Sequence, residues 1–581
     1  MATVSGEADR HPAVKALLAR LTRCIGDCAR QEMGEVPTAT VAALAERVVA
    51  EVREFVEGQS QHIYELVKIG LALSAEKNTD HLLEMIVSEA RRFTHADGGT
   101  LYIKADERPE LAFAIVQNDS LRVHMGGSGQ PITWPNVPLL LPDGGANHRN
   151  VSAHCALTGE AVNIPDVYCA DGYDFQGTRD FDASTGYRSR SMLVIPMRDH
   201  EDQVIGVLQL LNAQDRATNE VVPFPEHEVD MVESLASQAA IALTNMRLVR
   251  ELENLMDSFV QTIGDAIDAK SPHTAGHIFR VANLTGELAS EINRAQEGSF
   301  AQVQFNEEQL AEIRMAAWLH DVGKITTPEH LMDKATKLET VFDRLELVRH
   351  RVEIARLERE LARLRGEAAT VDCGGPGCWE ELVDFLAVVN RGGEGMTDES
   401  LERLRWISGL TYRMEGAPRP LLEGDEVENL SVRRGTLTKE ERELMNHHAE
   451  MTIRMLGRLP FPRKLSNVAT YAGMHHEKLN GRGYPRGLTA ERIPLPARML
   501  ALADVVEALT AADRPYKEGK MLSEAMAILE GMVERGELDG ELCDLAVSSG
   551  LISRFARETL PDRQRDDFVW RGRRYSVAEP R

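Results

Sequence analysis

Apolar and polar positions follow different patterns in the two halves of this chain. Between about residues 61 and 247 the spacing predicts short strands at 100–104, 111–116, 192–197 and 204–211. Helices are predicted around these strands at about 62–75, 80–95 and 226–250. The stretch 118–190 is rich in Gly, Asn, Asp and Pro, which favour turns. From about residue 255 the pattern is almost entirely helical, so an α+β domain followed by an all-α helical bundle is predicted.

The domain boundaries follow from where this pattern changes. A chain of 581 residues is too long for one compact core. We predict an N-terminal helical segment, an α+β domain, a linking helix, an all-α domain and a C-terminal tail, at 1–60, 61–247, 248–263, 264–563 and 564–581. Residues 338–435 are predicted to be a helical insertion in the all-α domain. It begins with a long charged helix, Glu339–Arg365, and its Cys373 and Cys378 lack the spacing of a usual zinc site.

The linking helix carries an apolar stripe. Its members recur at spacings of three and four: Val232, Leu235, Ala239, Ala242, Met246 and Val249, then Leu252, Met256, Phe259 and Ile263. A two-stranded coiled coil between two copies of the chain would use such a seam. A homodimer is therefore predicted, and a helix that packs on its own domain is the alternative.

Composition restricts the partners. The formal net charge of −25 repels nucleic acid polymers and anionic membranes over most of the surface. An anionic substrate would therefore need a local cluster of cations or metal ions. The sequence shows no signal peptide and no apolar run long enough for a bilayer, and its 7 cysteines form no CxxC pair. A cytoplasmic protein with reduced thiols is predicted, neither inserted in a membrane nor bound to nucleic acid polymers.

Ionisable side chains recur on the apolar faces of five predicted helices. They are His277, His320, Asp321, His448, His475, His476 and Asp504. Ser271 and Pro272 predict the start of the helix with His277, whereas His447 faces Glu450 and is left out. One histidine on an apolar face is usually a satisfied core residue, but burying so many ionisable groups is costly. A cluster of divalent cations would compensate, and imidazole with carboxylate suits iron, manganese, nickel or zinc.

Two regions resemble known families. The segments Ser184–Met197 (STGYRSRSMLVIPM) and Val204–Asn212 (VIGVLQLLN) resemble the GAF sensor domains of cyclic-nucleotide-regulated proteins. Residues 319–325 (LHDVGKI) resemble the signature of HD phosphohydrolases, and 475–485 (HHEKLNGRGYP) that of the HD-GYP branch. The runs 493–498 and 514–517 complete the match. The resemblance implies a signal-transduction phosphodiesterase that acts on the bacterial second messenger cyclic di-GMP under control of a GAF domain.

The resemblance also implies a ligand set for two divalent transition-metal ions, iron or manganese. His277, His320, Asp321 and Asp504 would hold one ion. Asp321, His448, His475 and His476 would hold the second, with Asp321 shared. Some relatives bind a third metal through a glutamate four residues before the first histidine, where this chain has His273. That histidine could still be a ligand, but two ions are expected. Asn480 replaces an aspartate of many relatives, with little expected consequence.

Catalysis would involve the metal ligands and a few neighbours. Asp321 and Lys324 are the predicted catalytic residues, and the predicted substrate contacts are Lys324, Gly483, Tyr484, Arg514 and Lys517. Two ions would activate water for attack on phosphorus. The implied product is pGpG, with a further cut to GMP left open. Gly483 and Tyr484 could instead only shape a turn.

Two other functions are compatible with the same motifs. One is a receptor that binds cyclic di-GMP without cleaving it, and the other is an HD enzyme for another cyclic dinucleotide. The expected regulator is an unknown small molecule in the GAF domain that twists the helix over 230–263. A GAF domain that only mediates dimerisation is the alternative.

Overall fold

The computed structural model describes residues 50, 64, 67–76, 78–105, 108–270, 276–366, 378–392, 396–511 and 519–577. The chain divides into two compact units, residues 1–253 and 254–581. The predicted N-terminal helical segment lies outside the described residues except for residue 50. One helix, α7 (Glu226–Asp268), begins in the first unit and ends in the second.

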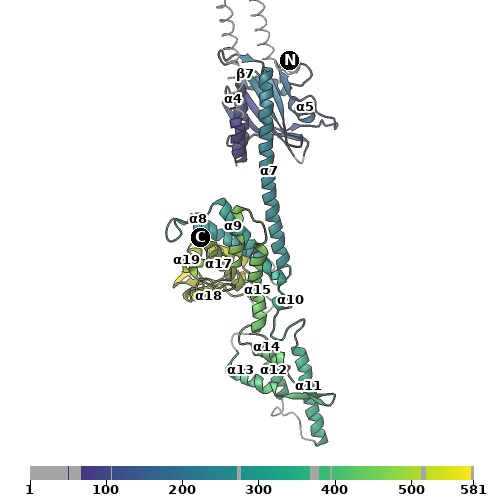
Figure 1. The fold of residues 1–581 in the computed structure, drawn as a ribbon, viewed down its shortest axis with the longest axis vertical. Coiled ribbons are helices and arrows are strands. Elements are labelled where there is room, and N and C mark those ends of the chain that lie inside the picture. Colours follow the sequence, from purple (N-terminus) through teal and green to yellow (C-terminus); the bar gives the residue numbers. More distant parts are fainter. Residues whose placement is uncertain are drawn as a thin grey trace, which may run out of the picture. The chain divides into compact units, whose positions relative to one another are not determined.

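An antiparallel sheet forms the centre of the first unit (Figure 1). Its strands are β1 (Ala96–Lys104), β2 (Glu110–Asn118), β3 (Val123–Met125), β4 (Val137–Pro138), β5 (Val162–Ile164), β6 (Met192–Arg198), β7 (Val204–Gln214) and β8 (Val221–Val222). The order along the main path is β3-β2-β1-β7-β6-β5, with β4 on β2 and β8 on β7. The four strands predicted from the sequence are β1, β2, β6 and β7, each slightly longer than expected.

Alternating side chains divide the sheet into two faces. Leu193 and Ile195 pack in one core with α4 (Thr79–Thr94) and the first part of α7. Met192 and Val194 pack in another with α5 (Val151–Thr158). This period of two is what a strand buried on both faces requires. The helix α6 (Gln176–Thr185) follows β5.

The apolar stripe predicted for a coiled coil belongs partly to this core. Val232, Leu235, Ala239 and Ala242 are at most 8% exposed and pack against the sheet of their own unit. The first half of the predicted dimer seam is therefore wrong, because those residues cover the sheet. The alternative of a helix packed on its own domain holds for that half.

The second unit is built mainly of helices. They are α8 (His277–Arg294), α9 (Glu307–Leu319), the 3-10 turn η1 (Val322–Thr326), α10 (Glu329–Met332), α15 (Lys439–Leu456), the 3-10 turn η2 (Arg463–Leu465), α16 (Val468–Gly473), the 3-10 turn η3 (Ala490–Arg492), α17 (Leu495–Thr510), α18 (Leu522–Glu534), α19 (Gly540–Ser548), α20 (Leu551–Thr559) and the 3-10 turn η4 (Asp562–Gln564). One apolar core joins most of them.

The C-terminal residues form a hairpin, which the sequence pattern did not predict. Its strands are β11 (Phe568–Trp570) and β12 (Arg573–Tyr575). Phe568 and Trp570 are 1% and 3% exposed and belong to the core of the second unit. The segment is therefore an integral part of that unit.

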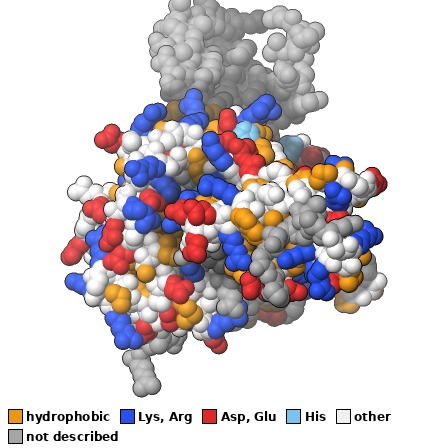
Figure 2. Space-filling model, turned by 90° about the horizontal axis from the view of Figure 1, so that it is seen from below, with side chains coloured by type: hydrophobic (Ala, Val, Ile, Leu, Met, Phe, Trp, Pro, Cys, Tyr) orange, Lys and Arg blue, Asp and Glu red, His pale blue; other side chains and the backbone are white. Residues whose placement is uncertain are grey.

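The predicted insertion has a hydrophobic core of its own, between Leu338 and Leu430. It contains α11 (Leu345–Arg365), α12 (Cys378–Asn390), α13 (Asp398–Ser408), α14 (Gly424–Leu430) and a hairpin of β9 (Thr411–Met414) and β10 (Ala417–Pro420). The insertion is therefore not entirely helical, and its charged helix begins at Leu345 instead of Glu339. Figure 2 shows acidic, basic and apolar side chains interspersed over the face of the molecule that is seen from below.

Two further observations concern expectations from composition. Cys155, Cys169 and Cys543 have free thiols, but Cys378 is disulfide-bonded, so the expectation of reduced thiols is wrong for Cys378. Among the described helices, none combines the length and apolar character that crossing a membrane needs.

Candidate metal centre

Asp321 lies at the meeting point of four histidines. Its Oδ2 is 3.5 Å from Nε2 of His277 and 3.2 Å from Nε2 of His320. Its Oδ1 is 3.4 Å from Nε2 of His448 and 3.7 Å from Nε2 of His475. Each oxygen of one buried carboxylate thus faces a different pair of imidazoles.

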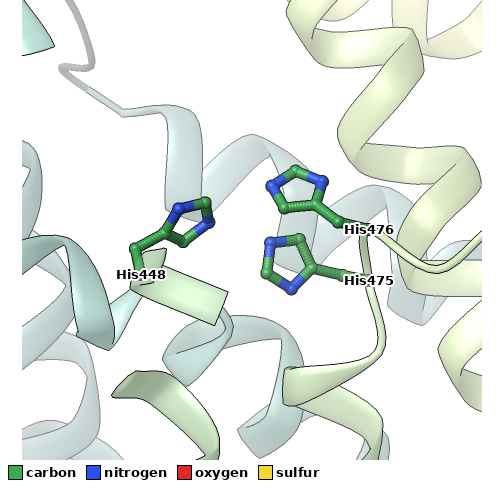
Figure 3. Close-up of side chains that lie close together, drawn as sticks. All are labelled: His448, His475 and His476. Carbon is green, nitrogen blue, oxygen red and sulfur yellow. The ribbon is translucent and has the colours of Figure 1, made fainter. Parts of the chain in front are cut away.

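Asp504 is a second carboxylate that lies between imidazoles, those of His277 and His476. Its Oδ1 is 3.5 Å from Nε2 of His277, and its Oδ2 is 3.7 Å from Nδ1 of His476. Figure 3 shows the rings of His448, His475 and His476 gathered together. The structure brings together all seven side chains that the sequence nominated as metal ligands. Within them, His277, His320 and Asp321 form one group whose ligand atoms lie within 4.8 Å, and the three histidines of Figure 3 form another.

Backbone carbonyls fix the orientation of three imidazoles. The Nδ1–H groups of His320, His448 and His475 each donate to the carbonyl three residues earlier, at 2.6 Å. These bonds hold the proton on Nδ1, so that Nε2 keeps its lone pair and faces Asp321. Second bonds of this kind are what metal-binding histidines commonly make.

The inward-facing atoms of the described site residues lie near one another without forming hydrogen bonds. Among the described residues, Nε2 of His277, His320, His448 and His475 and Oδ1 of Asp321 are buried and make no hydrogen bond. Leaving so many polar atoms unpaired would be costly. Divalent cations would satisfy all of them, so this donor set fits transition metals that accept imidazole and carboxylate ligands.

The sequence pattern indicated that all of the proposed ligands lie on helices, but in the structure some of them do not. His277 begins α8, His448 lies in α15 and Asp504 in α17, but His475 and His476 occupy the turn after α16. Neighbouring helical residues point about 100° apart. A turn can aim both rings inward, which explains why the helical placement was wrong for this pair. His320 and Asp321 connect α9 to η1.

Close packing brings η1 against α15. A Cβ on Gly323 would lie 1.9 Å from the carbonyl oxygen of His448, so only glycine permits the contact. Thr452, one turn beyond His448, accepts from Gly323 N and donates to the carbonyl of His320, both at 3.0 Å. Gly323 and Thr452 thereby hold His320 and His448 on opposite sides of Asp321.

Sequence reasoning missed the residues that orient His277. Glu507 accepts from Nδ1 of His277 at 2.5 Å, and Arg280 donates to the same carboxylate at 2.6 and 2.8 Å. Glu507 follows Asp504 by three positions on α17, and Arg280 follows His277 by three on α8. The shared helical faces were the signal that could have revealed both.

Burial sets the charge of most of the imidazoles. It lowers the pKa of His475 and His448, and lowers the pKa of His476 to about 4. These rings are therefore neutral near pH 7, in the form that binds metal ions.

His277 and Asp321 behave differently. Burial alone would lower the pKa of His277, but Asp321 and Glu507 raise it to about 10. Burial alone would raise the pKa of Asp321, but Lys324 and His320 hold it well below its usual value. Asp321 therefore remains a carboxylate. Because a metal ion on Nε2 would take the place of a proton, binding an ion at His277 would be coupled to proton release.

Lys324 lies at the centre of the site. Its Nζ donates to Oδ2 of Asp321 at 2.5 Å. Lys270, just after α7, donates from Nζ to the carbonyls of Lys324, Ile325 and Thr327 at 3.0, 2.7 and 2.6 Å. The end of α7 is thereby tied to the segment that follows Asp321.

The loop with Gly483 and Tyr484 covers His476. The ring centroid of Tyr484 lies 4.7 Å from that of His476. A Cβ on Gly483 would lie 2.3 Å from Lys478 N, so this glycine is needed for the path of the loop. Buried Glu477, which the sequence analysis did not nominate, accepts from the backbone of Arg486 and Leu488. His273, Arg514 and Lys517 lie outside the described residues.

Comparison with known proteins agrees with both domains. The GAF domain family matches residues 78–243. HD domain families match residues 274–404 and 421–542. The chain therefore contains a GAF domain followed by an HD domain, which confirms the recognition made from the sequence. The α+β domain followed by a helical bundle is likewise confirmed.

Similar curated proteins are named as phosphodiesterases. A 3'3'-cGAMP-specific phosphodiesterase 1 of Vibrio cholerae is 49% identical over 82 residues, 14% of this chain and 19% of that protein. The cyclic di-GMP phosphodiesterase response regulator RpfG of Xanthomonas campestris is 32% identical over 183 residues, 29% and 47% of the two chains. A 3'3'-cGAMP-specific phosphodiesterase 3 of Vibrio cholerae is 24% identical over 349 residues, 56% and 51%. The chain thus spans at most about half the length of these relatives.

Proposed function

We propose that this chain is a metal-dependent phosphodiesterase that hydrolyses cyclic di-GMP to pGpG, with a further cut to GMP left open. The observation that carries this proposal is the set of buried ligand atoms without hydrogen-bond partners around Asp321. The activities for which the relatives are named support a cyclic dinucleotide as substrate.

Two divalent transition-metal ions, iron or manganese, belong to the proposal. His277, His320, Asp321 and Asp504 would hold one ion, and Asp321, His448, His475 and His476 the other. Because Asp504 also lies 3.7 Å from His476, it could contribute to either ion. When bound, these ions would supply the Lewis-acid chemistry of phosphodiester hydrolysis.

The chain's own residues would bind and orient the substrate. The ammonium of Lys324 already lies beside Asp321, where a phosphate oxygen would be expected. The ring of Tyr484, which lies against His476, would offer an apolar surface and a hydroxyl to the substrate. Gly483 would help to bind the substrate indirectly, because the path of the loop that carries Tyr484 needs a glycine at this position. Arg514 and Lys517 remain sequence predictions of further positive charge.

Turnover by metal-reconstituted protein tests the proposal. Purified protein is stripped of metal, reloaded with Mn²⁺ or Fe²⁺ under anaerobic conditions, and given cyclic di-GMP, with products separated by chromatography. We expect pGpG from the wild type and at most traces from Asp321→Ala. Binding of cyclic di-GMP without any product would instead identify a receptor.

A second substrate deserves the same assay, because two of the relatives are named as 3'3'-cGAMP-specific. Equal concentrations of cyclic di-GMP and 3'3'-cGAMP in one reaction would compete for the site. Preferential loss of cyclic di-GMP is the expected result, whereas preferential loss of 3'3'-cGAMP would reassign the substrate.

Homodimerisation through α7 is also part of the proposal, with an exposed stripe that shares Leu252 and Phe259 with the predicted one. Ile241, Leu248, Leu252, Leu255 and Phe259 are 46–65% exposed. With Asn245 they follow alternating spacings of four and three, the period of a coiled coil. A polar Asn at one core position favours pairing with an identical helix in one register.

Sedimentation of the full chain tests this pairing. Leu252→Glu places a charge in the stripe and should yield monomers. Asn254→Glu, which adds the same charge at an exposed position off the stripe, should leave the dimer intact. A monomeric wild type would refute the pairing.

The proposal also includes regulation by a small molecule that binds the GAF domain and acts through α7. The proposed location is the cytoplasm. Loss of ligand-dependent activity after deletion of residues 1–225 is the expected outcome. An unchanged response in that deletion would place the control elsewhere.

A further inference from the structure

The GAF domain has a partly open cavity of about 440 Å³ on the side of its sheet that faces α5. Strands β1, β2, β6 and β7 contribute side chains to it, as do the first residues of α5 and α6. This volume is within the range of pockets for small organic molecules. The cavity lies entirely within the first unit.

Aromatic rings form a continuous wall of this cavity. The centroids of Tyr102 and Phe113 are 4.7 Å apart, those of Phe113 and Trp134 5.4 Å, and those of Trp134 and Phe181 5.9 Å. All four side chains line the cavity. Such a wall offers stacking and edge contacts to a flat aromatic ring.

Three carboxamides of the sheet line the cavity, those of Gln117, Asn118 and Gln209, and that of Gln209 is held in a fixed orientation from inside the cavity wall. Oε1 of Gln209 accepts from the hydroxyls of Tyr102 and Ser152, at 3.2 and 3.0 Å. Because the oxygen is engaged in this way, the amide NH₂ of Gln209 is the part left to donate to a ligand. The matching ligand atom is an acceptor, such as a ring nitrogen or a carbonyl oxygen.

Charge then restricts the ligand class. Among the described residues that line the cavity there is no Lys, Arg or His, and the charged side chain present is Asp174. A phosphate held inside the cavity, against this lining, would therefore lack a compensating cation and would be repelled by Asp174. The first turn of α5 reaches the cavity, but the side chain of Asn150 already accepts from its Ala153 N at 3.0 Å.

We infer that this cavity binds an uncharged, planar heteroaromatic molecule that presents a hydrogen-bond acceptor to Gln209. The ring is recognised by the aromatic wall, and a phosphate attached to it is disfavoured. The inference does not rest on the proposed phosphodiesterase activity, because binding can be measured without turnover.

Calorimetric titration of the full chain with matched pairs of compounds tests this inference. The pairs differ by the phosphate alone and are inosine and inosine 5'-monophosphate, adenosine and AMP, and riboflavin and riboflavin 5'-phosphate. At least one uncharged member should bind, at least about tenfold more tightly than its phosphorylated counterpart. If no uncharged member binds, or if the phosphorylated members bind more tightly, the inference fails.

Two variants of β7 locate the binding. Gln209→Leu removes the donor at similar volume and should weaken binding of the uncharged compound about five- to tenfold. Gln214→Leu changes a glutamine of the same strand that does not line the cavity and should leave the affinity unchanged. Equal affinities for wild type and Gln209→Leu would exclude this cavity as the site. Hydrolysis of cyclic di-GMP in the absence of ligand should be the same for both variants.

Discussion

Replacing Glu507 by glutamine would test how the metal centre is held in place. The carboxylate of Glu507 accepts from Nδ1 of His277 on one oxygen and from Arg280 on the other. Glutamine keeps the shape but offers one oxygen and one NH₂. If the oxygen stays on Arg280, the NH₂ faces Nδ1 of His277, and the imidazole proton must move to Nε2. Nε2 is the atom that faces Asp321 and Asp504, so this tautomer cannot bind an ion.

The size of the effect follows from the role of such partners. Loss of a residue that orients a metal-binding histidine typically weakens metal binding 10- to 100-fold, or about 1.4–2.7 kcal/mol. We expect this loss for the ion near His277. The ion near His448, His475 and His476 should be less affected, since Glu507 contacts none of these rings among the described hydrogen bonds. At a metal concentration that just saturates the wild type with two ions per chain, the occupancy of Glu507→Gln should therefore fall towards one ion per chain.

Metal titration of the stripped protein, followed by calorimetry and elemental analysis, measures both quantities. Glu312→Gln is a matched control. Glu312 is a carboxylate in the same unit, 4% exposed, and it accepts from Asn467 at 2.6 and 3.2 Å away from the metal centre. Both variants should lose thermal stability, but only Glu507→Gln should lose metal affinity. If Glu507→Gln binds two ions as tightly as the wild type, or if Glu312→Gln weakens binding equally, the reasoning is wrong.

Three other expectations follow from the same geometry. Gly323→Ala should disrupt metal binding because its Cβ would meet His448 O at 1.9 Å, whereas Gly286→Ala, with open space, should be tolerated in metal titrations. Lys270→Met should lower kcat more than it raises KM, because it removes three hydrogen bonds to carbonyls of the segment after Asp321. Lys270→Arg should restore part of the rate. Equal kinetics for the wild type and both variants would exclude this role of Lys270. In the metal-free protein, His476 takes up a proton near pH 6.5 in the unfolded chain but only near pH 4 in the folded chain. The free energy of unfolding should therefore fall as the pH falls through this window. Urea titrations of His476→Asn should show a smaller fall.

Five of the seven side chains proposed as metal ligands could be nominated because each carries a local signal. His320 and Asp321 lie in a dense motif, and His277, His448 and Asp504 follow the helical period of their neighbours. The turn that carries His475 and His476 was not predictable from that period. Its geometry depends on the contact of the following loop with Glu477, which is far from obvious in a sequence of mixed polar residues.

Errors arose where one pattern serves two purposes. The stripe through Val232 and Leu235 has the spacing of a coiled coil, but a helix lying on a sheet needs the same spacing. The exposed stripe through Leu248 and Leu255 could be separated from it only after burial was known. The C-terminal hairpin was missed because its turn residues are Arg571 and Gly572, both with positive φ, instead of the usual Asn-Gly.

The orienting residues depended on contacts between distant helices. Nothing in the neighbourhood of Glu507 indicates that it meets His277, which lies 230 positions earlier. Only the shared face with Asp504 could have suggested that Glu507 also points to the metal centre. Lys270 offered no signal, because its three partners are backbone carbonyls.

The central claim is that Asp321 is shared between two metal ions held by residues remote in sequence. Anomalous diffraction from crystals of the manganese- or iron-loaded protein measures this directly. We expect two anomalous peaks, each with a carboxylate oxygen of Asp321 at about 2 Å, one beside His277 and His320 and the other beside His448 and His475. A single peak, or two peaks of which neither contacts Asp321, would contradict the account.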